Sequence, residues 1–279
     1  MSSVTFFGAD IAQPLWDDEP CEGAFQLDQT TNLDTTVVKQ VSRPWLFGYK
    51  PAKSNGRAIL ILAGGGYIEL MAGKEGVIVA RWLTSLGFNA YVLIHRFPNR
   101  ETGSHAPVDD ARKALCMIKE GGLASNGLGI CGLSSGGHLG AALLADYPTE
   151  WPSKDSIPTI DFAIIGYGPI STNAVGRQII ANKPPLEPPE KQKLYDTVQP
   201  DVQMIKSDRP TFIVYSGNDP IVPVVNAYRL AEAITQAGGS VELHVFADAP
   251  HGFALDTNDL PVSKWPEMCE AWMKQNHIL

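Results

Sequence analysis

Three side chains that could together perform acyl transfer stand far apart in the sequence: Ser134, Asp219 and His251. A serine hydroxyl is a poor nucleophile near neutral pH, so it needs a base to take its proton, and the base needs an acid to orient it. Triads of this kind occur in the chain order serine, aspartate, histidine. We therefore predict that Ser134 is the nucleophile, His251 the base and Asp219 the orienting acid.

Ser134 lies in a pattern typical of a sharp strand-to-helix turn. The apolar run from Leu128 to Cys131 predicts a buried strand, and the run from Leu139 to Leu144 has helical character. Between them stands Gly132-x-Ser134-x-Gly136. Residues around such a turn crowd one another, and glycine permits the close approach because it lacks a Cβ atom. The five-residue pattern alone also fits a plain glycine-rich loop, so the flanking strand and helix decide in favour of a nucleophile.

Asp219 and His251 each follow a predicted strand. Asp219 comes after Thr211 to Tyr215, and His251 comes after Val241 to Phe246. In a parallel sheet the reactive groups gather at the C-terminal ends of the strands, so the two side chains are expected at one edge. Taken singly, Asp219 could be a turn-former before proline and His251 a loop histidine. Three further aspartates compete for the acid role: Asp201, Asp208 and Asp248.

A glycine cluster follows an earlier predicted strand and could supply donors for the oxyanion of a tetrahedral intermediate. We choose the backbone N–H groups of Gly65 and Gly66, together with that of Ser135, the residue after the nucleophile. A plain turn is the alternative. The cluster does not form the G-x-G-x-x-G pattern of a dinucleotide site. Tyr67 follows the glycines, and we expect its ring to wall the acyl pocket and its hydroxyl to bind substrate.

The remaining histidines fit other roles. His138 lies about one helical turn after Ser134, so it competes for the role of base, but packing and hydrogen bonding beneath the turn suit it better. His95 ends a predicted strand, and a structural role is favoured for it as well. No group of His, Asp, Glu or Cys has the spacing of metal ligands, and we expect neither a metal nor another cofactor.

Composition narrows the class of protein. The chain has 279 residues, 44% of them hydrophobic, with a formal net charge of −8 and a pI near 5.2. This charge argues against nucleic-acid partners and anionic membrane surfaces. The N-terminus has neither a basic segment nor a continuous apolar run, so we expect no leader peptide and a cytoplasmic location. Four cysteines without close pairing suit a reducing compartment: Cys21, Cys116, Cys131 and Cys269.

Predicted strands and helices alternate along most of the chain. This alternation predicts an α/β fold with a mostly parallel central sheet and helices on both faces, built as a single domain over residues 1–279. The predicted strands are Ala58–Leu62, Phe88–Ile94, Leu128–Cys131, Phe162–Ile165, Thr211–Tyr215 and Val241–Phe246, after one or two edge strands in Val37–Tyr49. The predicted helices are Glu75–Leu86, Ala106–Lys119, Val222–Ala237 and Lys264–Gln275, besides the one after Ser134.

Two segments fall outside this alternation. Residues 1–33 are expected to form an irregular N-terminal arm. Residues 171–207 form a proline-rich insertion that is too long for an ordinary connection, and a lid and a solvated excursion are equally good interpretations of it. Its middle is charged, with little apolar surface, so we predict a polar, partly mobile cover over a narrow acyl pocket. The charged residues there are Lys183, Glu187, Glu190, Lys191 and Lys193.

Several motifs between about residues 45 and 255 together resemble the α/β-hydrolase superfamily, in particular its acetyl-xylan-esterase-like, feruloyl-esterase-related branch. The motifs are Ala63-Gly-Gly-Gly-Tyr67 with Lys74-Glu-Gly76, Gly132-Leu-Ser-Ser-Gly-Gly-His138, Gly217-Asn-Asp-Pro-Ile-Val-Pro223, and Glu242-Leu-His-Val-Phe246 with His251-Gly252. Members often have His or Pro before the glycines, where this chain has Ala63. The N-terminal arm and the insertion lie outside the resemblance.

The resemblance implies a carboxylester hydrolase that uses the triad without a cofactor. Members often hydrolyse short acyl esters, including acetylated sugars. An amide-cleaving relative, of the arylformamidase or peptidase kind, remains the alternative among enzymes. A catalytically silent binding protein with the hydrolase fold is the alternative from another class, although an intact triad argues against it.

Overall fold

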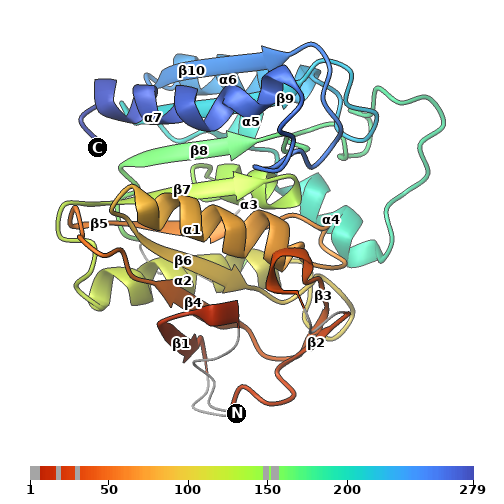
Figure 1. Cartoon of the computed structure of the whole chain (residues 1–279). Helices are drawn as coiled ribbons and strands as arrows, with labels where there is room; N and C mark the ends of the chain where they lie inside the picture. Colours follow the sequence, from red (N-terminus) through yellow and green to blue (C-terminus); the bar gives the residue numbers. More distant parts are fainter. Residues whose placement is uncertain (1–6, 17–19, 29–31, 147–150, 152–156) are drawn as a thin grey trace.

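Eight strands form one twisted sheet at the centre of the molecule (Figure 1). The computed structural model describes residues 7–16, 20–28, 32–146, 151 and 157–279. The strand order is β1-β4-β6-β5-β7-β8-β9-β10. Strands β1 and β4 run antiparallel to their neighbours, and the strands from β6 to β10 are mutually parallel. The strands are β1 Ile11–Pro14, β4 Trp45–Tyr49, β5 Arg57–Leu62, β6 Asn89–Ile94, β7 Gly127–Leu133, β8 Phe162–Gly166, β9 Pro210–Ser216 and β10 Ser240–Phe246.

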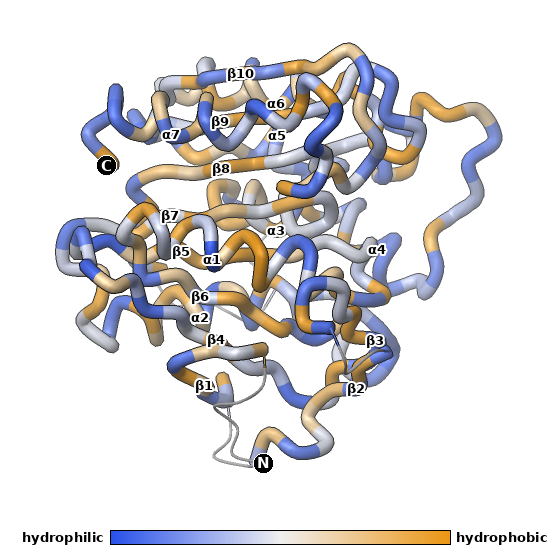
Figure 2. The backbone as a smooth tube through the Cα atoms, viewed as in Figure 1, coloured by the Kyte–Doolittle hydropathy of each residue, from blue (hydrophilic) through white to orange (hydrophobic). Residues whose placement is uncertain are grey.

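The central strands are apolar along their whole length because both faces of the sheet are covered. From Ala58 to Leu62 every residue of β5 is completely buried, and β6, β7 and β8 are almost as inaccessible. Figure 2 shows hydrophobic colour along these strands, whereas hydrophilic colour is concentrated in the turns and on the outer surfaces. The mostly parallel sheet predicted from the sequence is confirmed.

Helices cover the sheet on both sides. Figure 1 shows α1 (Ile78–Ser85) and α7 (Trp265–Gln275) in front of it, with α2 (Ala106–Glu120), α3 (Ser135–Ala142) and α6 (Val225–Gln236) behind. The two front helices touch each other: the rings of Trp82 and Trp265 lie 5.3 Å apart, and Trp82 Nε1 donates to Glu270 Oε1 at 3.1 Å. These contacts close the front layer over the core.

The strand order fixes where reactive groups can meet. After β5 the chain first forms β6 on one side of it and then crosses to form β7 on the other. A crevice opens outside the C-terminal ends of the strands at such a switch of direction. In Figure 1 the arrowheads of β7, β8 and β10 point toward the edge of the sheet where α4 lies. The predicted site residues all follow strands that end at this edge.

The N-terminal arm is more regular than we predicted. Within residues 1–33, β1 pairs with β4 at the edge of the main sheet, and β2 (Phe25–Leu27) pairs with β3 (Val38–Val41) in a second small sheet. Strands of three or four residues are too short to show a periodic pattern, so tertiary pairing decides them. Residues 1–6, 17–19 and 29–31 of the arm lie outside the described residues.

The arm is held by a small aromatic cluster. The ring of Phe7 lies 5.8 Å from that of Phe25 and 5.0 Å from that of Phe47 in β4. Because β1 pairs along β4, β4 is an interior strand, whereas the sequence favoured an edge position for this part of the chain. Pro14 ends β1, as expected for the edge strand of a sheet.

The insertion 171–207 contains helices that the proline content concealed. They are α4 (Pro189–Thr197) and α5 (Pro200–Gln203). Each has proline within its first turn, where the missing N–H has no intrahelical partner to lose. Leu194 and Tyr195 anchor α4 in the interior. The predicted helix from Glu75 also differs in detail, since a π-helical segment (Ala72–Val77) precedes α1.

Candidate active site

Ser134 occupies the turn between β7 and α3 in a strained backbone conformation. Its φ is 53° and its ψ is −124°. A Cβ atom at Gly132 would lie 2.2 Å from the carbonyl oxygen of Gly136, and one at Gly136 would lie 1.9 Å from the carbonyl oxygen of Leu62. No side chain fits at either position, so the spacing of the glycines around Ser134 follows from the tightness of the turn. The side chain of Ser134 is thereby presented at the C-terminal edge of the sheet.

The structure brings the three predicted triad residues together. Ser134 Oγ lies 2.9 Å from His251 Nε2, and His251 Nδ1 lies 2.7 Å from Asp219 Oδ2. A carboxylate can only accept hydrogen bonds, so Nδ1 carries the proton of the neutral ring and Nε2 is left to accept from the Ser134 hydroxyl. This arrangement can activate a serine nucleophile.

Asp219 is held in place from the other side by the backbone. Its Oδ1 accepts from the N–H groups of Ile221 at 2.8 Å and Val222 at 2.9 Å. Two of the competing aspartates are engaged elsewhere: Asp201 pairs with Arg177, and Asp248 accepts from the side chain of Asn218 at 2.7 Å. Asp219 is therefore the aspartate that the fold directs at His251.

His138 is fully buried beneath the turn and both of its ring nitrogens are in use. Nε2 lies 2.9 Å from the carbonyl oxygen of Val198, which can only accept, so Nε2 carries the proton. Nδ1 then accepts from the hydroxyl of Tyr67 at 2.9 Å. Burial lowers the pKa of His138 to about 4, which keeps the ring neutral. These contacts agree with the packing role that we favoured for His138.

The same contact corrects the role expected for Tyr67. Its hydroxyl is occupied by His138, and its side chain is 1% exposed. Tyr67 has a positive φ of 61°, and its ring packs into the interior against His95 and Tyr195. We expected it to bind substrate because it follows the glycines directly, a position that does not reveal the direction of the side chain. Tyr195, from the insertion, is the tyrosine that lines the cavity beside Ser134.

The glycine cluster approaches Ser134 closely, as expected for an oxyanion loop, but its N–H groups have different partners. Gly64 N donates to Glu75 Oε2 at 2.7 Å, whereas Gly66 N donates to the side-chain hydroxyl of Ser135 at 2.9 Å. Gly65 has a φ of 132°, and a Cβ atom there would lie 2.1 Å from the carbonyl oxygen of Glu69. The Ser135 N–H begins α3, where backbone donors have no intrahelical acceptor.

Glu75 is a component of the site for which the sequence analysis predicted no role. Its side chain is 2% exposed, and its two oxygens accept from Gly64 N and from the hydroxyl of Tyr167, the latter at 2.9 Å. Burial raises the pKa of this carboxyl, and the two hydrogen bonds oppose the rise. The ring of Tyr167 in turn lies 5.3 Å from that of His251. A carboxylate among small and apolar residues before α1 was the available signal, since buried acids need partners.

A cavity of about 350 Å³ opens above Ser134. The insertion contributes about half of its lining, so this segment borders the space above Ser134, and its role as a cover stays a prediction. The lining residues from the insertion are Asn173, Ile180, Lys183, Leu186, Lys191 and Tyr195. The other lining residues include Gly66, Ser135, Pro169, Pro220, Ile221 and Val222.

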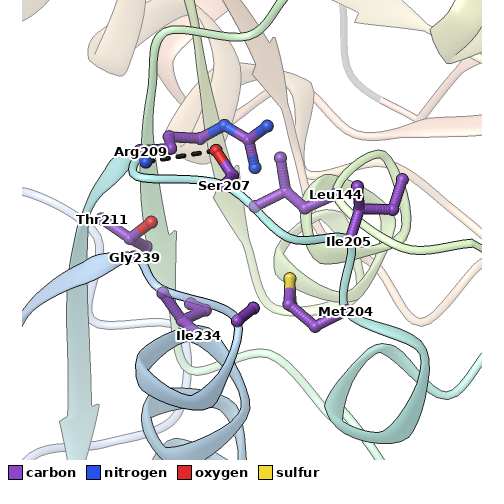
Figure 3. A pocket seen from close by; sticks show the side chains of 9 residues that line it. Leu144, Met204, Ile205, Ser207, Arg209, Thr211, Ile234 and Gly239 are labelled. Carbon is purple, nitrogen blue, oxygen red and sulfur yellow. Dashed lines mark hydrogen bonds between the residues drawn. The ribbon is translucent and has the colours of Figure 1, made fainter.

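A second cavity lies away from this site, between the segment that follows α3, the end of α6 and the start of β9 (Figure 3). Its volume is about 10 Å³, which is near the space that one water molecule needs, and it is too small for a substrate. In the described part of the chain, no three His, Cys, Asp or Glu side chains form a group that could hold a metal ion. No helix within the described ranges is long and apolar enough to cross a membrane.

Comparison with known proteins identifies relatives that share this architecture. An acetylxylan esterase of Xylanibacter ruminicola is 26% identical over 234 residues, which are 82% of this chain and 48% of that protein. Acylamino-acid-releasing enzyme 2 of Oryza sativa subsp. japonica is 25% identical over 72% of this chain and 28% of its own length. The chain thus spans half or less of the length of these curated relatives.

The crystal structure of an acetyl ester-xyloside bifunctional hydrolase from Caldicellulosiruptor lactoaceticus superposes with a TM-score of 0.70, at 24% identity, over 96% of this chain and 97% of that one. This likeness establishes the α/β-hydrolase fold. The model of the dienelactone hydrolase family matches residues 100–279, more than half of the chain and the part that holds Ser134, Asp219 and His251. The chain is a member of the dienelactone hydrolase family.

Proposed function

We propose that the protein is a serine carboxylesterase that hydrolyses short-chain acyl esters, including acetylated sugars. The observation that carries this proposal is the continuous hydrogen-bonded relay from Ser134 through His251 to Asp219, with separations of 2.9 and 2.7 Å. The relay ends on a carboxylate that two backbone N–H groups hold in place. Such a relay generates a nucleophile at neutral pH without help from outside the chain.

In the proposed reaction, His251 Nε2 takes the proton of Ser134 as Oγ attacks the ester carbonyl carbon. The tetrahedral intermediate places negative charge on the former carbonyl oxygen. We propose that the N–H groups of Ser135, Gly65 and Gly66 bind this oxygen, with Gly66 N exchanging its present acceptor, the hydroxyl of Ser135, for the oxyanion. His251 then gives its proton to the departing alcohol, which leaves an acyl group on Ser134. Water, activated by His251, attacks the acyl carbon and releases the acid and the free serine.

The size of the cavity supports a small acyl group. Its volume of about 350 Å³ must hold the substrate between Ser134 and the residues of the insertion. The name of the Xylanibacter ruminicola relative supports acetyl esters of sugars as substrates to test first. We further propose that the chain acts as one catalytic unit over residues 1–279, because one sheet includes strands from Ile11 to Phe246.

The test is covalent labelling of the purified protein with a fluorophosphonate, followed by mass spectrometry of its peptides. We expect one label on Ser134, loss of p-nitrophenyl acetate hydrolysis in proportion to labelling, and no label in Ser134→Ala. A protein that folds but takes no label and hydrolyses no ester would instead be a silent binding protein.

Amide cleavage is the second candidate, and the similarity to an acylamino-acid-releasing enzyme favours testing it. An ester and an amide with the same acetyl group and similar leaving groups, such as p-nitrophenyl acetate and p-nitroacetanilide, separate the two chemistries. Formylkynurenine-type formamides extend the panel to small amides. We expect the ester to be the better substrate, and faster hydrolysis of the amide would reverse the assignment.

A further inference from the structure

One helix of the insertion is fixed directly to the residues beneath Ser134. This helix is α4, and the ring of its Tyr195 lies 4.5 Å from that of His138 and 5.6 Å from that of Tyr67. Just after the helix, the carbonyl oxygen of Val198 accepts from His138 Nε2 at 2.9 Å. Because His138 lies about one helical turn after Ser134, these contacts fix the position of α4 relative to the nucleophile.

Lys191 lies on the same face of α4 as Tyr195, because residues four apart are neighbours on the surface of a helix. Both side chains line the cavity above Ser134. Lys191 Nζ reaches toward the glycine cluster, since a Cβ atom built on Gly66 would lie 3.7 Å from it. Helix α4 therefore directs an ammonium group to the loop that we propose for the oxyanion.

This ammonium group is not engaged by the protein. In the part of the chain that the structure describes, Lys191 Nζ has neither a carboxylate partner nor a hydrogen-bond acceptor. Lys183 differs, because its Nζ donates to the side-chain oxygen of Asn173. Burial lowers the pKa of Lys191, and the charge of Lys183 lowers this pKa further. Lys191 is therefore a partly buried cation that a negative charge in the cavity would stabilise.

The N–H groups of the glycine cluster are only partly available to an oxyanion. Gly64 N donates to Glu75 Oε2. Gly66 N donates to the hydroxyl of Ser135, and this bond has to break before Gly66 N can bind another acceptor. The ammonium group beside Gly66 is a donor that is already free and that carries a positive charge.

A cation in this position acts on the transition state more than on the bound ester. A neutral ester carries no net charge, whereas the tetrahedral intermediate places a negative charge on the former carbonyl oxygen. An interaction that strengthens as this charge develops raises kcat, whereas one of equal strength in both states would only lower KM.

We propose that Lys191 is a catalytic residue whose ammonium group donates a hydrogen bond to the oxyanion of the tetrahedral intermediate. The inference rests on the proposed esterase function and adds a residue to its mechanism. As Ser134 Oγ bonds to the ester carbon, the electron pair of the C=O π bond moves onto the oxygen. Lys191 keeps its proton throughout, and the charge-assisted hydrogen bond weakens when the carbonyl re-forms. This contribution is the same for every alcohol and acyl group.

The first test measures kcat and KM for p-nitrophenyl acetate, a neutral ester. In Lys191→Met we expect kcat to fall by a factor on the order of 10², as after removal of an oxyanion donor, with KM changed by less than about threefold. Lys191→Arg keeps the charge and should retain about tenfold more activity than the methionine variant. Lys193→Met is the matched control, since this exposed lysine of α4 does not line the cavity and its loss changes the net charge equally.

The second test uses two inhibitors of nearly the same shape. 1,1,1-Trifluoro-4-phenylbutan-2-one adds reversibly to the nucleophilic serine and forms a hemiketal oxyanion, whereas 4-phenylbutan-2-one remains an uncharged ketone. In Lys191→Met, the Ki of the trifluoromethyl ketone should rise by about the factor by which kcat/KM falls, while the Ki of the plain ketone should not change.

A kcat within about threefold of the wild type in Lys191→Met would overturn the proposal. So would an equal rise in Ki for both ketones, which would make Lys191 a residue that only shapes the cavity. Thermal unfolding checks that the variant is folded, and Lys191→Gln replaces it in both tests if it is not. Absence of both ester hydrolysis and fluorophosphonate labelling in the wild type would instead contradict the esterase function itself.

Discussion

The buried residues beneath Ser134 and the insertion that lines the cavity above it differ in burial and in hydrogen bonding. We call the first group the floor of the active site and the second the cover. The floor consists of Glu75, Tyr167, His138 and Tyr67. Their side chains are at most 2% exposed, and all of their side-chain polar atoms have hydrogen-bond partners in the protein. The cover is the insertion 171–207. It is partly exposed, contains apolar side chains that face solvent, and contributes Lys183 and Lys191 to the lining of the cavity. The polar side chains of the floor are therefore satisfied within the protein, whereas side chains of the cover remain open to the cavity and to solvent.

The difference indicates that the floor and the cover have separate roles in the proposed reaction. Residues of the floor contact the glycine cluster and the ring of His251, and His138 lies in the helix that begins after Ser134. We therefore expect the floor to determine the geometry of the reaction. The cover lines the space that we propose for the substrate, so we expect it to determine which ester enters. Substitutions in the floor are expected to reduce the rate on all esters, and substitutions in the cover, Lys191 excepted, are expected to alter the order of preference among esters. Five experiments test this division and its structural basis.

The largest effect is expected at the nucleophile. Ser134→Ala should fold normally and lose hydrolysis of p-nitrophenyl acetate by a factor on the order of 10³ or more in kcat/KM. Ser135→Ala is the matched control. It removes a hydroxyl that accepts from Gly66 N but keeps the backbone donor, so we expect less than about a tenfold loss. An inactive Ser135→Ala beside an active Ser134→Ala would mean that the nucleophile is misassigned.

The two histidines beneath and above Ser134 should separate catalysis from folding. His251→Ala should lose activity by about the same factor as Ser134→Ala, because both remove one unit of the relay. His138→Gln keeps groups that can donate to Val198 and accept from Tyr67, and its activity should fall by less than about tenfold. The reverse ranking would make His138 the base.

The same His138→Gln variant tests stability against pH. The pKa of His138 is lowered from 6.5 to about 4 in the folded protein, so as the pH falls below 6.5 the unfolded chain takes up a proton first. The stability that this neutral ring contributes is present above that value and is lost as the pH falls toward 4. Thermal unfolding between pH 7 and 4 should therefore show a shallower decline in Tm for the variant than for the wild type.

A smaller effect is expected from the length of the acyl group. Acetyl and propionyl esters should be preferred over octanoyl esters by at least about tenfold in kcat/KM, roughly 1.4 kcal/mol, because the cavity of about 350 Å³ is small and the insertion lines about half of it. A series of p-nitrophenyl esters from acetyl to octanoyl measures this preference. Equal or better turnover of the octanoyl ester would show that the cover opens onto a larger apolar surface.

The smallest change in rate is expected from Glu75, the buried carboxyl group of the floor. Glu75→Gln keeps the shape of the side chain but weakens its acceptance from Gly64 N or from the Tyr167 hydroxyl, which should destabilise the protein by about 1–3 kcal/mol. The resulting loss in kcat should be similar for all esters. Glu267→Gln, at an exposed position, is the control for the change of charge. A change in substrate ranking without a loss of stability would place Glu75 in the substrate site.

Much of this architecture could be predicted from the sequence because the signals are local. Continuous apolar runs identify the parallel strands, and the glycines around Ser134 mark a turn in which side chains cannot fit. Ser134, Asp219 and His251 each follow a predicted parallel strand, and this predicted their meeting because the strands of a parallel sheet end at one edge. The N-terminal strands escaped prediction because strands of three or four residues form only where a partner strand is present.

The sequence alone therefore determined the class of fold and the residues from which the chemistry is proposed, because backbone sterics and the burial of apolar strands act over a few neighbouring residues. Only the tertiary structure decided where the side chains point and which groups lie next to the charged side chains. It turned Tyr67 inward onto His138, set Glu75 beneath the glycine cluster, and brought Lys183 and Lys191 over a serine about fifty residues earlier in the chain. Contacts of that kind depend on how distant segments pack, and no local pattern of residues contains them.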